Sequence, residues 1–178
     1  MALPGVLVQA GSHLATFFES DAGRLRIAAP FLRDGLLLGQ PCFLIASGEV
    51  LDLYVAALEK DVKAELAEAL RIGLFATAPT PGRTVQEALA FWDQRIGAAL
   101  SAGPTVVRIV GDMACVKTNF ATVHEMLIFE RLVGAVIKRS PSVAVCQYDA
   151  REFDGQALLE AMKGHPDVFD LGLEKLVS

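Results

Sequence analysis

The chain has 178 residues, of which 53% are hydrophobic and 21% charged, so it can bury a sizeable core, and a disordered or low-complexity protein is excluded. Its 16 Lys and Arg against 21 Asp and Glu residues give a net charge of −5 with no basic run, which argues against direct binding to nucleic acid or an anionic membrane. The mean hydropathy of +0.42 raises the question of a membrane segment. However, Gly and Pro interrupt the longest charge-free stretches, 1–18 and 35–48, and the second falls short of the ~20 residues of a spanning helix.

The start of the chain also lacks the basic residues of a signal peptide. The three cysteines, Cys42, Cys115 and Cys146, form no CxxC pair, which predicts neither a disulfide framework nor a zinc knuckle. We therefore expect a cytoplasmic protein with no membrane association.

Short apolar segments alternate with amphipathic helical patterns along the chain. The expected strands cover residues 13–19, 42–46, 72–77, 105–110 and 143–148, and the stretch 5–8 can add a strand before them. The expected helices cover residues 21–38, 51–58, 61–70, 84–102, 121–139 and 155–163, with a loop at 78–82. This order predicts an α/β fold in which helices cover both faces of a mostly parallel sheet. Without a repeat, linker or break in composition, residues 1–178 are expected to form one domain.

Several helix ends carry recognisable signals. Ser20 is a suitable N-cap for the helix at 21–38, and Gly39 is a suitable stop. Pro30 lies inside that helix and is expected to kink it. Thr84 with Glu87 forms a capping box for the helix that follows.

Two charged residues interrupt apolar patterns. Glu130 lies in the middle of the apolar face of the helix at 121–139, so it should pair with a cation or bind a ligand, unless it belongs to a structural ion pair or a helix end that reaches solvent. Arg108 lies between β-branched residues and needs a carboxylate, which Glu130 or Asp112 could supply, unless it points outward from an edge strand. Alternation puts Arg108 and Asp112 on one face, with Asp112 at the carboxyl end of its strand, where open α/β sheets bind ligands.

Five further polar residues fall on or near strands. His13 and Glu19 share one face of the first strand, Cys146 and Tyr148 share a face of the last, and His165 precedes Pro166 in a turn. Each also has an ordinary structural interpretation, such as a hydrogen-bonded histidine or a cysteine that packs as a small hydrophobic residue.

Several catalytic and cofactor motifs do not occur. The sequence lacks a P-loop, a GxGxxG dinucleotide motif, a GxSxG elbow and an HExxH metal motif. We therefore expect no enzyme activity, no cofactor and no metal. The spacing leaves open whether His13, Glu130, Cys146 and His165 converge on a metal in three dimensions.

An ordered set of segments resembles the MEDS domain, a sensory domain named for methanogen and methylotroph proteins and the dichloromethane-responsive regulator. The segments are 13–20 (HLATFFES), 29–35 (APFLRDG), 108–113 (RIVGDM), 129–130 (FE), 146–149 (CQYD) and 165–166 (HP). The resemblance covers about residues 13–169 and implies an α/β fold related to RecA and KaiC-type ATPases but without their phosphate-binding loop. It also implies a role in sensing small hydrocarbon-derived ligands, in chains that carry DNA-binding or histidine-kinase modules.

The resemblance carries over to seven polar positions, namely His13, Glu19, Arg108, Glu130, Cys146, Tyr148 and His165. Two positions depart from the family pattern, because Asp112 stands where Glu is usual and Phe129 where Tyr is usual. The first shortens an acidic side chain and the second removes a hydroxyl, so the ligand can differ. Since the chain is essentially the sensory domain alone, the resemblance implies that it signals through a partner.

We therefore expect a non-enzymatic cytoplasmic sensor that binds a small, largely apolar ligand near the strand carboxyl ends. Its expected ligand-binding residues are His13, Glu19, Arg108, Asp112, Glu130, Cys146, Tyr148 and His165. The expected partner is a histidine kinase or another regulatory protein, with a homodimer left open. The alternatives are a ligand-independent interaction module that regulates such a protein, or a small enzyme that uses Glu130 or Cys146 with a histidine.

Overall fold

The computed structural model describes residues 2–3, 6–77, 84–101, 103, 106–165 and 167–168. Six parallel strands form the main sheet in the order β5-β4-β6-β7-β3-β8. They are β3 (His13–Phe18), β4 (Cys42–Ile45), β5 (Phe75–Thr77), β6 (Val107–Asp112), β7 (Ser142–Asp149) and β8 (Asp167–Val168). A separate antiparallel pair consists of β1 (Ala2–Leu3) and β2 (Val6–Leu7).

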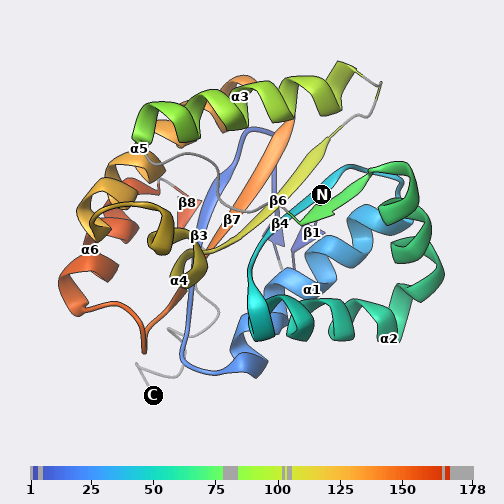
Figure 1. Ribbon diagram of the computed structural model, residues 1–178, viewed down its shortest axis with the longest axis horizontal. Helices are drawn as coiled ribbons and strands as arrows, with labels where there is room; N and C mark the ends of the chain where they lie inside the picture. The colour runs from blue at the N-terminus through green and yellow to red at the C-terminus, as the bar shows by residue number, and fades with distance from the viewer. Residues whose placement is uncertain are drawn as a thin grey trace.

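Helices cover both faces of this sheet, which gives three layers (Figure 1). One face carries α1 (Asp21–Leu37) and α2 (Gly48–Ile72); the other carries α3 (Val85–Ser101), α5 (Val123–Arg139) and α6 (Gly155–Gly164). A short helix, α4 (Met113–Val116), follows β6 directly. The predicted α/β architecture with a covered parallel sheet is therefore confirmed.

Local signals explain where the helices begin. The Ser20 hydroxyl accepts a hydrogen bond from the Gly23 amide at the start of α1, and Thr84 and Glu87 exchange the two bonds of a capping box before α3. The helix α1 runs through Pro30. Within the described residues, no helix combines the length and hydrophobicity needed to cross a bilayer.

Several predicted boundaries differ from the structure. The two helices predicted after Ser47 form one element, α2, with a break in helical geometry at Val62. The third predicted strand starts later, because Ile72 still belongs to α2. Neither α4 nor β8 was predicted, and the strand predicted at 5–8 pairs with β1 outside the main sheet. The loop predicted at 78–82 lies outside the described residues.

The sheet separates two hydrophobic cores. Tyr54, Phe31 and Val110 belong to the core under α1 and α2, whereas Trp92, Ile109 and Tyr148 belong to the core under α3, α5 and α6. Successive residues of a strand enter opposite cores, as Ile109 and Val110 do, because side chains alternate along a strand. The face on which a strand residue lies therefore decides which polar groups it can meet.

Candidate functional site

Five of the predicted ligand-binding residues meet in the core under α5. His13 opens β3, Cys146 and Tyr148 lie on the neighbouring β7, Glu130 comes from α5, and His165 follows α6. The His13 Nε2 atom is 3.2 Å from Cys146 Sγ and 3.7 Å from Glu130 Oε2. His165 Nε2 lies 3.1 Å from the same carboxylate oxygen, to which the Tyr148 hydroxyl donates at 3.2 Å. Every member of this polar cluster is buried.

Strand register explains how residues far apart in sequence reach this cluster. His13 pairs with Ala144 across the β3–β7 ladder, so Cys146 and Tyr148 point to the same face two and four residues further along. Glycine at position 134 lets α5 approach the strand, since a Cβ atom there would lie 3.0 Å from His13 Nδ1. The His165 Nδ1–H group donates to the Ala161 carbonyl at 2.7 Å, which turns Nε2 toward Glu130.

Burial and mutual charge set the pKa values of the cluster. Burial lowers the pKa of His13 to about 4, although the Glu130 charge opposes this shift. Burial also opposes ionisation of Glu130, but the neighbouring imidazoles hold the pKa of its carboxyl below the usual value. The pKa of His165 is raised, because the adjacent Glu130 carboxylate outweighs the effect of burial. Burial and the Glu130 charge raise the pKa values of Cys146 and Tyr148 well above normal.

A small cavity adjoins the cluster, with a volume of about 40 Å³. One side of the cavity is formed by the sheet, through two rows of residues that are paired across neighbouring strands. The first row is Ile109, Ala144 and His13, and the second is Ile45, Gly111 and Cys146. Side chains of α3, α4 and α5 close it, namely Trp92, Met113, Val116, Phe129, Glu130, Val133 and Ile137. The lining is apolar except for the neighbouring side chains of His13, Glu130 and Cys146.

A cleft of about 640 Å³ lies on the outer side of His13. It is lined by residues 9–13 before and at the start of β3, by Arg131, Gly134, Ala135 and Lys138 of α5, and by Gly164. His13 lines both the cleft and the cavity, so it stands between the cluster and the surface.

The expectation that Arg108 pairs with Glu130 or Asp112 is wrong. Arg108 faces α1, on the opposite side of the sheet from Glu130, and it donates to the Phe31 carbonyl at 2.7 Å and to Gln40 Oε1 at 2.7 Å. Its guanidinium also lies 4.9 Å from the centre of the Phe31 ring. Arg108 is therefore bound by neutral groups in the other core and does not reach the cavity.

The two predicted acidic residues Glu19 and Asp112 also lie outside the cluster. Glu19 is exposed just after β3. Asp112 is buried at the carboxyl end of β6, where it forms an ion pair with Arg24 of α1.

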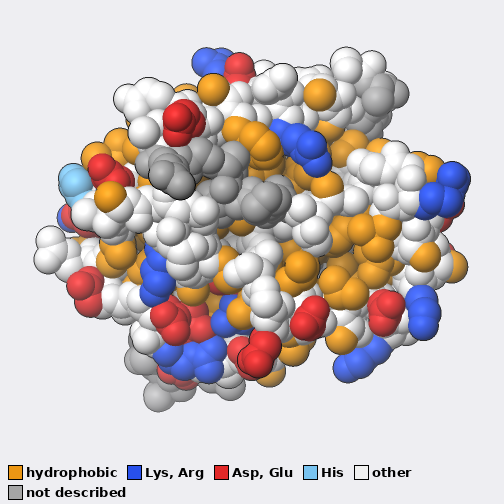
Figure 2. All heavy atoms as spheres, in the orientation of Figure 1, with side chains coloured by type: hydrophobic (Ala, Val, Ile, Leu, Met, Phe, Trp, Pro, Cys, Tyr) orange, Lys and Arg blue, Asp and Glu red, His pale blue; other side chains and the backbone are white. Residues whose placement is uncertain are grey.

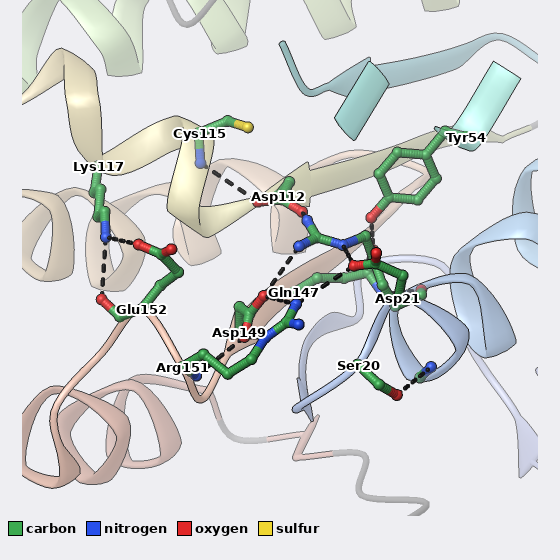
Figure 3. A network of polar contacts seen from close by, with 12 residues as sticks. Ser20, Asp21, Tyr54, Asp112, Cys115, Lys117, Gln147, Asp149, Arg151 and Glu152 are labelled. Carbon is green, nitrogen blue, oxygen red and sulfur yellow. Dashed lines mark hydrogen bonds and ion pairs between the residues drawn. The ribbon is translucent and has the colours of Figure 1, made fainter. Parts of the chain in front are cut away.

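A second polar network surrounds this ion pair (Figure 3). Arg24 also donates to Asp149 at 3.0 Å, and Asp149 accepts a 2.6 Å bond from Arg151. Gln147 donates to the Arg24 carbonyl and accepts a bond from the Tyr54 hydroxyl. Burial raises the pKa of Asp112 despite Arg24, whereas the hydrogen bond from Arg151 lowers the pKa of Asp149.

The sequence prediction did not include Arg24, although a signal for it exists. Arg24 precedes Ala28 and Leu32 at helical spacing, which places it on the inner stripe of α1. The network lies at the carboxyl ends of β6 and β7 and at the start of α1, which Arg24 joins through its ion pairs with Asp112 and Asp149.

Comparison with known proteins identifies the family. The family model described as "MEthanogen/methylotroph, DcmR Sensory domain" (MEDS) matches residues 12–166. The chain belongs to the MEDS family. The matched range starts one residue before His13 and ends one residue after His165, so it contains the whole cluster.

A curated relative of this MEDS chain is the transcriptional repressor DcmR of Methylorubrum extorquens, 28% identical over 158 residues. The aligned part covers 88% of this chain but 59% of the length of DcmR. The family model describes a sensory domain, so MEDS membership makes this chain a sensory domain.

Solved structures with low sequence identity share the fold. The chain aligns with an uncharacterised protein of Pyrococcus horikoshii, solved with an unknown peptide, at a TM-score of 0.65 and 12% identity, over 92% of this chain and 78% of that one. A KaiC-like protein from the same organism gives 0.61 and 11%, over 90% and 71%. The flagellar accessory protein FlaH of Methanocaldococcus jannaschii gives 0.55 and 13%, over 92% and 72%. The MEDS domain therefore has the RecA/KaiC-like fold that the resemblance implied.

Proposed function

We propose that this MEDS domain binds a small, apolar, hydrocarbon-derived molecule in the cavity under α3 and α5 and passes the signal to a partner protein. The observation that carries this proposal is the cavity itself, whose lining is apolar except for the neighbouring side chains of His13, Glu130 and Cys146. Ligand pockets commonly combine an apolar lining with a few polar groups that orient the ligand. Here His13, Glu130 and Cys146 are those groups. Arg108 is not one of them, because it lies on the opposite side of the sheet.

The size of the cavity limits the ligand to a few non-hydrogen atoms. One buried water molecule needs a cavity volume of about 10–15 Å³, so this cavity of about 40 Å³ has room for roughly three water molecules. Dichloromethane, with one carbon and two chlorine atoms, matches this size and the apolar lining. It is the probe we choose for the test.

The position of Gly111 supplies a precise test of this site. A Cβ atom added at Gly111 would lie 3.6 Å from Met113 Sδ and 3.9 Å from both Ile45 Cδ1 and Val116 Cγ2, which are ordinary contact distances. Gly111→Ala therefore places a methyl group in the cavity without forcing its neighbours to move. We expect it to weaken dichloromethane binding about tenfold, since overpacking a small site costs about 1–3 kcal/mol.

The measurement is a dichloromethane titration followed by amide chemical shifts in ¹⁵N-labelled protein. The matched control is Gly97→Ala, because Gly97 is exposed on α3 with no heavy atom within 4 Å of the added Cβ. Shift changes at residues 109–113 and 144–146 that saturate in the wild type and in Gly97→Ala, but not in Gly111→Ala, support the proposal. Equal binding by all three proteins contradicts it.

Exposed hydrophobic residues support the signalling part of the proposal. Leu37, Leu38, Leu70 and Ile72 are 49–66% exposed at the carboxyl ends of α1 and α2. Figure 2 shows hydrophobic side chains gathered on the part of the visible face that α2 borders in Figure 1, with acidic and basic side chains interspersed around them. Such a surface suits a protein partner.

The same surface favours a ligand-independent interaction module as the second candidate. If dichloromethane shifts no cavity resonance, this becomes the better interpretation. An enzyme that uses Cys146 and His13 has less support. The two groups are within reach of each other, but burial and the Glu130 charge raise the pKa of the Cys146 thiol well above its usual value, which disfavours the nucleophilic thiolate.

A further inference from the structure

We propose that His13, Glu130, Cys146 and His165 bind a divalent transition-metal ion, with Zn²⁺ as the expected metal. The four side chains offer two imidazole nitrogens, one carboxylate oxygen and one sulfur, all within 4.8 Å of one another. Imidazole, thiolate and carboxylate are the protein ligands of Zn²⁺. This proposal concerns a bound ion and goes beyond the binding of an apolar molecule next to it.

The distances suit a four-coordinate ion. Bonds of about 2.0–2.3 Å to the corners of a tetrahedron give corner-to-corner distances of roughly 3.3–3.8 Å. The separations are 3.2 Å for His13 to Cys146, 3.7 Å for His13 to Glu130 and 3.1 Å for His165 to Glu130. The other three ligand pairs lie within 4.8 Å, so side-chain shifts of up to about 1 Å would complete the tetrahedron.

The surroundings support the ligands as they do in metal sites. His165 donates its Nδ1–H to the Ala161 carbonyl, which fixes the tautomer and leaves the Nε2 lone pair facing the cluster. Although that Nε2 atom is close to Glu130, it is buried without a partner of hydrogen-bond geometry among the described residues. The Tyr148 hydroxyl donates a hydrogen bond to the same Glu130 Oε2 atom and so orients the carboxylate.

Charge balance also favours a divalent ion. A carboxylate and a thiolate bring two negative charges, so with M²⁺ and two neutral imidazoles the site has no net charge. This matters because each of the four residues is at most 6% exposed. The outer cleft that reaches His13 gives the ion a route from solvent.

The competing interpretation is a structural ion pair between a protonated His165 and Glu130, with Cys146 as a small hydrophobic residue. The two interpretations differ in what happens when a metal is offered. The protein without a purification tag suits this test, because the chain has only three histidines and three cysteines. The residues outside the cluster, His124, Cys42 and Cys115, serve as internal controls.

The experiment measures metal in the tag-free full chain by mass spectrometry, then titrates chelator-treated protein with Co²⁺. We expect about one metal per chain, and with Co²⁺ both the d–d absorption of a tetrahedral site and thiolate-to-cobalt charge transfer. The variants Glu130→Gln and His165→Asn should lose at least nine-tenths of the metal. Cys146→Ser should lose the charge-transfer absorption, whereas His124→Asn and Cys115→Ser should behave like the wild type.

Circular dichroism shows which variants are folded, and the wild-type cobalt spectrum requires no variant. A folded, chelator-treated wild type that develops neither absorption overturns the proposal, and so does a charge-transfer signal that Cys115→Ser abolishes. Because no organic ligand is added, failure here leaves the dichloromethane titration as a separate test of the proposed function.

Discussion

At the residue scale, the free energy of unfolding should depend on pH through the ionised carboxyl groups of the second polar network, and Asp149 gives the clearest case. Its pKa lies below the usual 3.8, chiefly because Arg151 donates to it. A carboxyl whose pKa is lower in the folded state stabilises the protein above its unfolded pKa, and this contribution is lost as the pH falls through the folded value. We expect Asp149→Asn to lower the free energy of unfolding by about 2 kcal/mol at pH 7, the usual cost of losing hydrogen bonds to a charged group.

Urea denaturation of both proteins at pH 7, 5 and 3 tests this dependence. The difference between wild type and Asp149→Asn should be the same at pH 7 and 5 and smaller at pH 3. The raised pKa of Asp112 acts in the opposite direction, but Asp112 is present in both proteins. Asp93→Asn is the control, because its partner Arg139 is exposed and such pairs contribute little. A difference that grows at pH 3 would contradict the assignment.

Residue patterns predicted part of the site. Alternation placed Cys146 and Tyr148 on one face of their strand, and the interrupted apolar stripe of α5 singled out Glu130. Alternation also grouped Arg108 with Asp112, and both do face α1. What alternation cannot show is which layer of helices that face meets, because strand order and connection decide it. Arg108 and Glu130 were therefore expected together, although the sheet separates them.

At the element scale, the packing of α1 on the sheet depends on Gly35. A Cβ atom there would lie 2.6 Å from both Arg108 Cδ and Cys42 Sγ. Arg108 cannot withdraw without losing its bonds to Gln40 and Phe31. We expect Gly35→Ala to destabilise the protein by about 1–3 kcal/mol through overpacking, although alanine is the better helix former.

Chemical denaturation of Gly35→Ala and Gly97→Ala separates packing from helix propensity. Gly97 also lies inside a helix but has open space beside it, so its replacement should stabilise the protein by about 0.5–1 kcal/mol. Opposite signs for the two variants are the expected result. If both variants gain stability, α1 does not approach the sheet as closely as the structure shows.

Local sequence signals predicted most of the helices and strands, but they did not predict which strands lie side by side in the sheet. The Ser20 cap and the Thr84–Glu87 capping box located two helix starts, because these signals act over three residues. The strand β3 lies between β7 and β8, far along the chain from both, and no local pattern encodes such a pairing. The two-residue β8 is too short for a periodicity to reveal.

At the scale of the whole molecule, α4 links the proposed ligand cavity to the second polar network. Asp112 caps α4 by accepting a bond from the Cys115 amide, while it also pairs with Arg24 across the network. Met113 and Val116 of the same helix line the cavity. A ligand that pushes on α4 therefore acts on the Arg24–Asp112–Asp149 network at the opposite face of the sheet.

This connection predicts that Asp112→Asn changes dichloromethane affinity, although Asp112 does not line the cavity. Asparagine still caps a helix, so the change mainly removes the charge that faces Arg24. We expect the dissociation constant to shift about three- to tenfold, within the 0.5–2 kcal/mol typical of coupled positions.

The control is Asp154→Asn, which alters the equivalent cap of α6, a helix that contributes no lining residue to the described cavity. Equal dissociation constants for Asp112→Asn, Asp154→Asn and wild type would show that cavity and network are uncoupled. Because coupling is reciprocal, a confirmed shift would mean that dichloromethane in turn alters the stability of the network, which is the change a partner protein could detect.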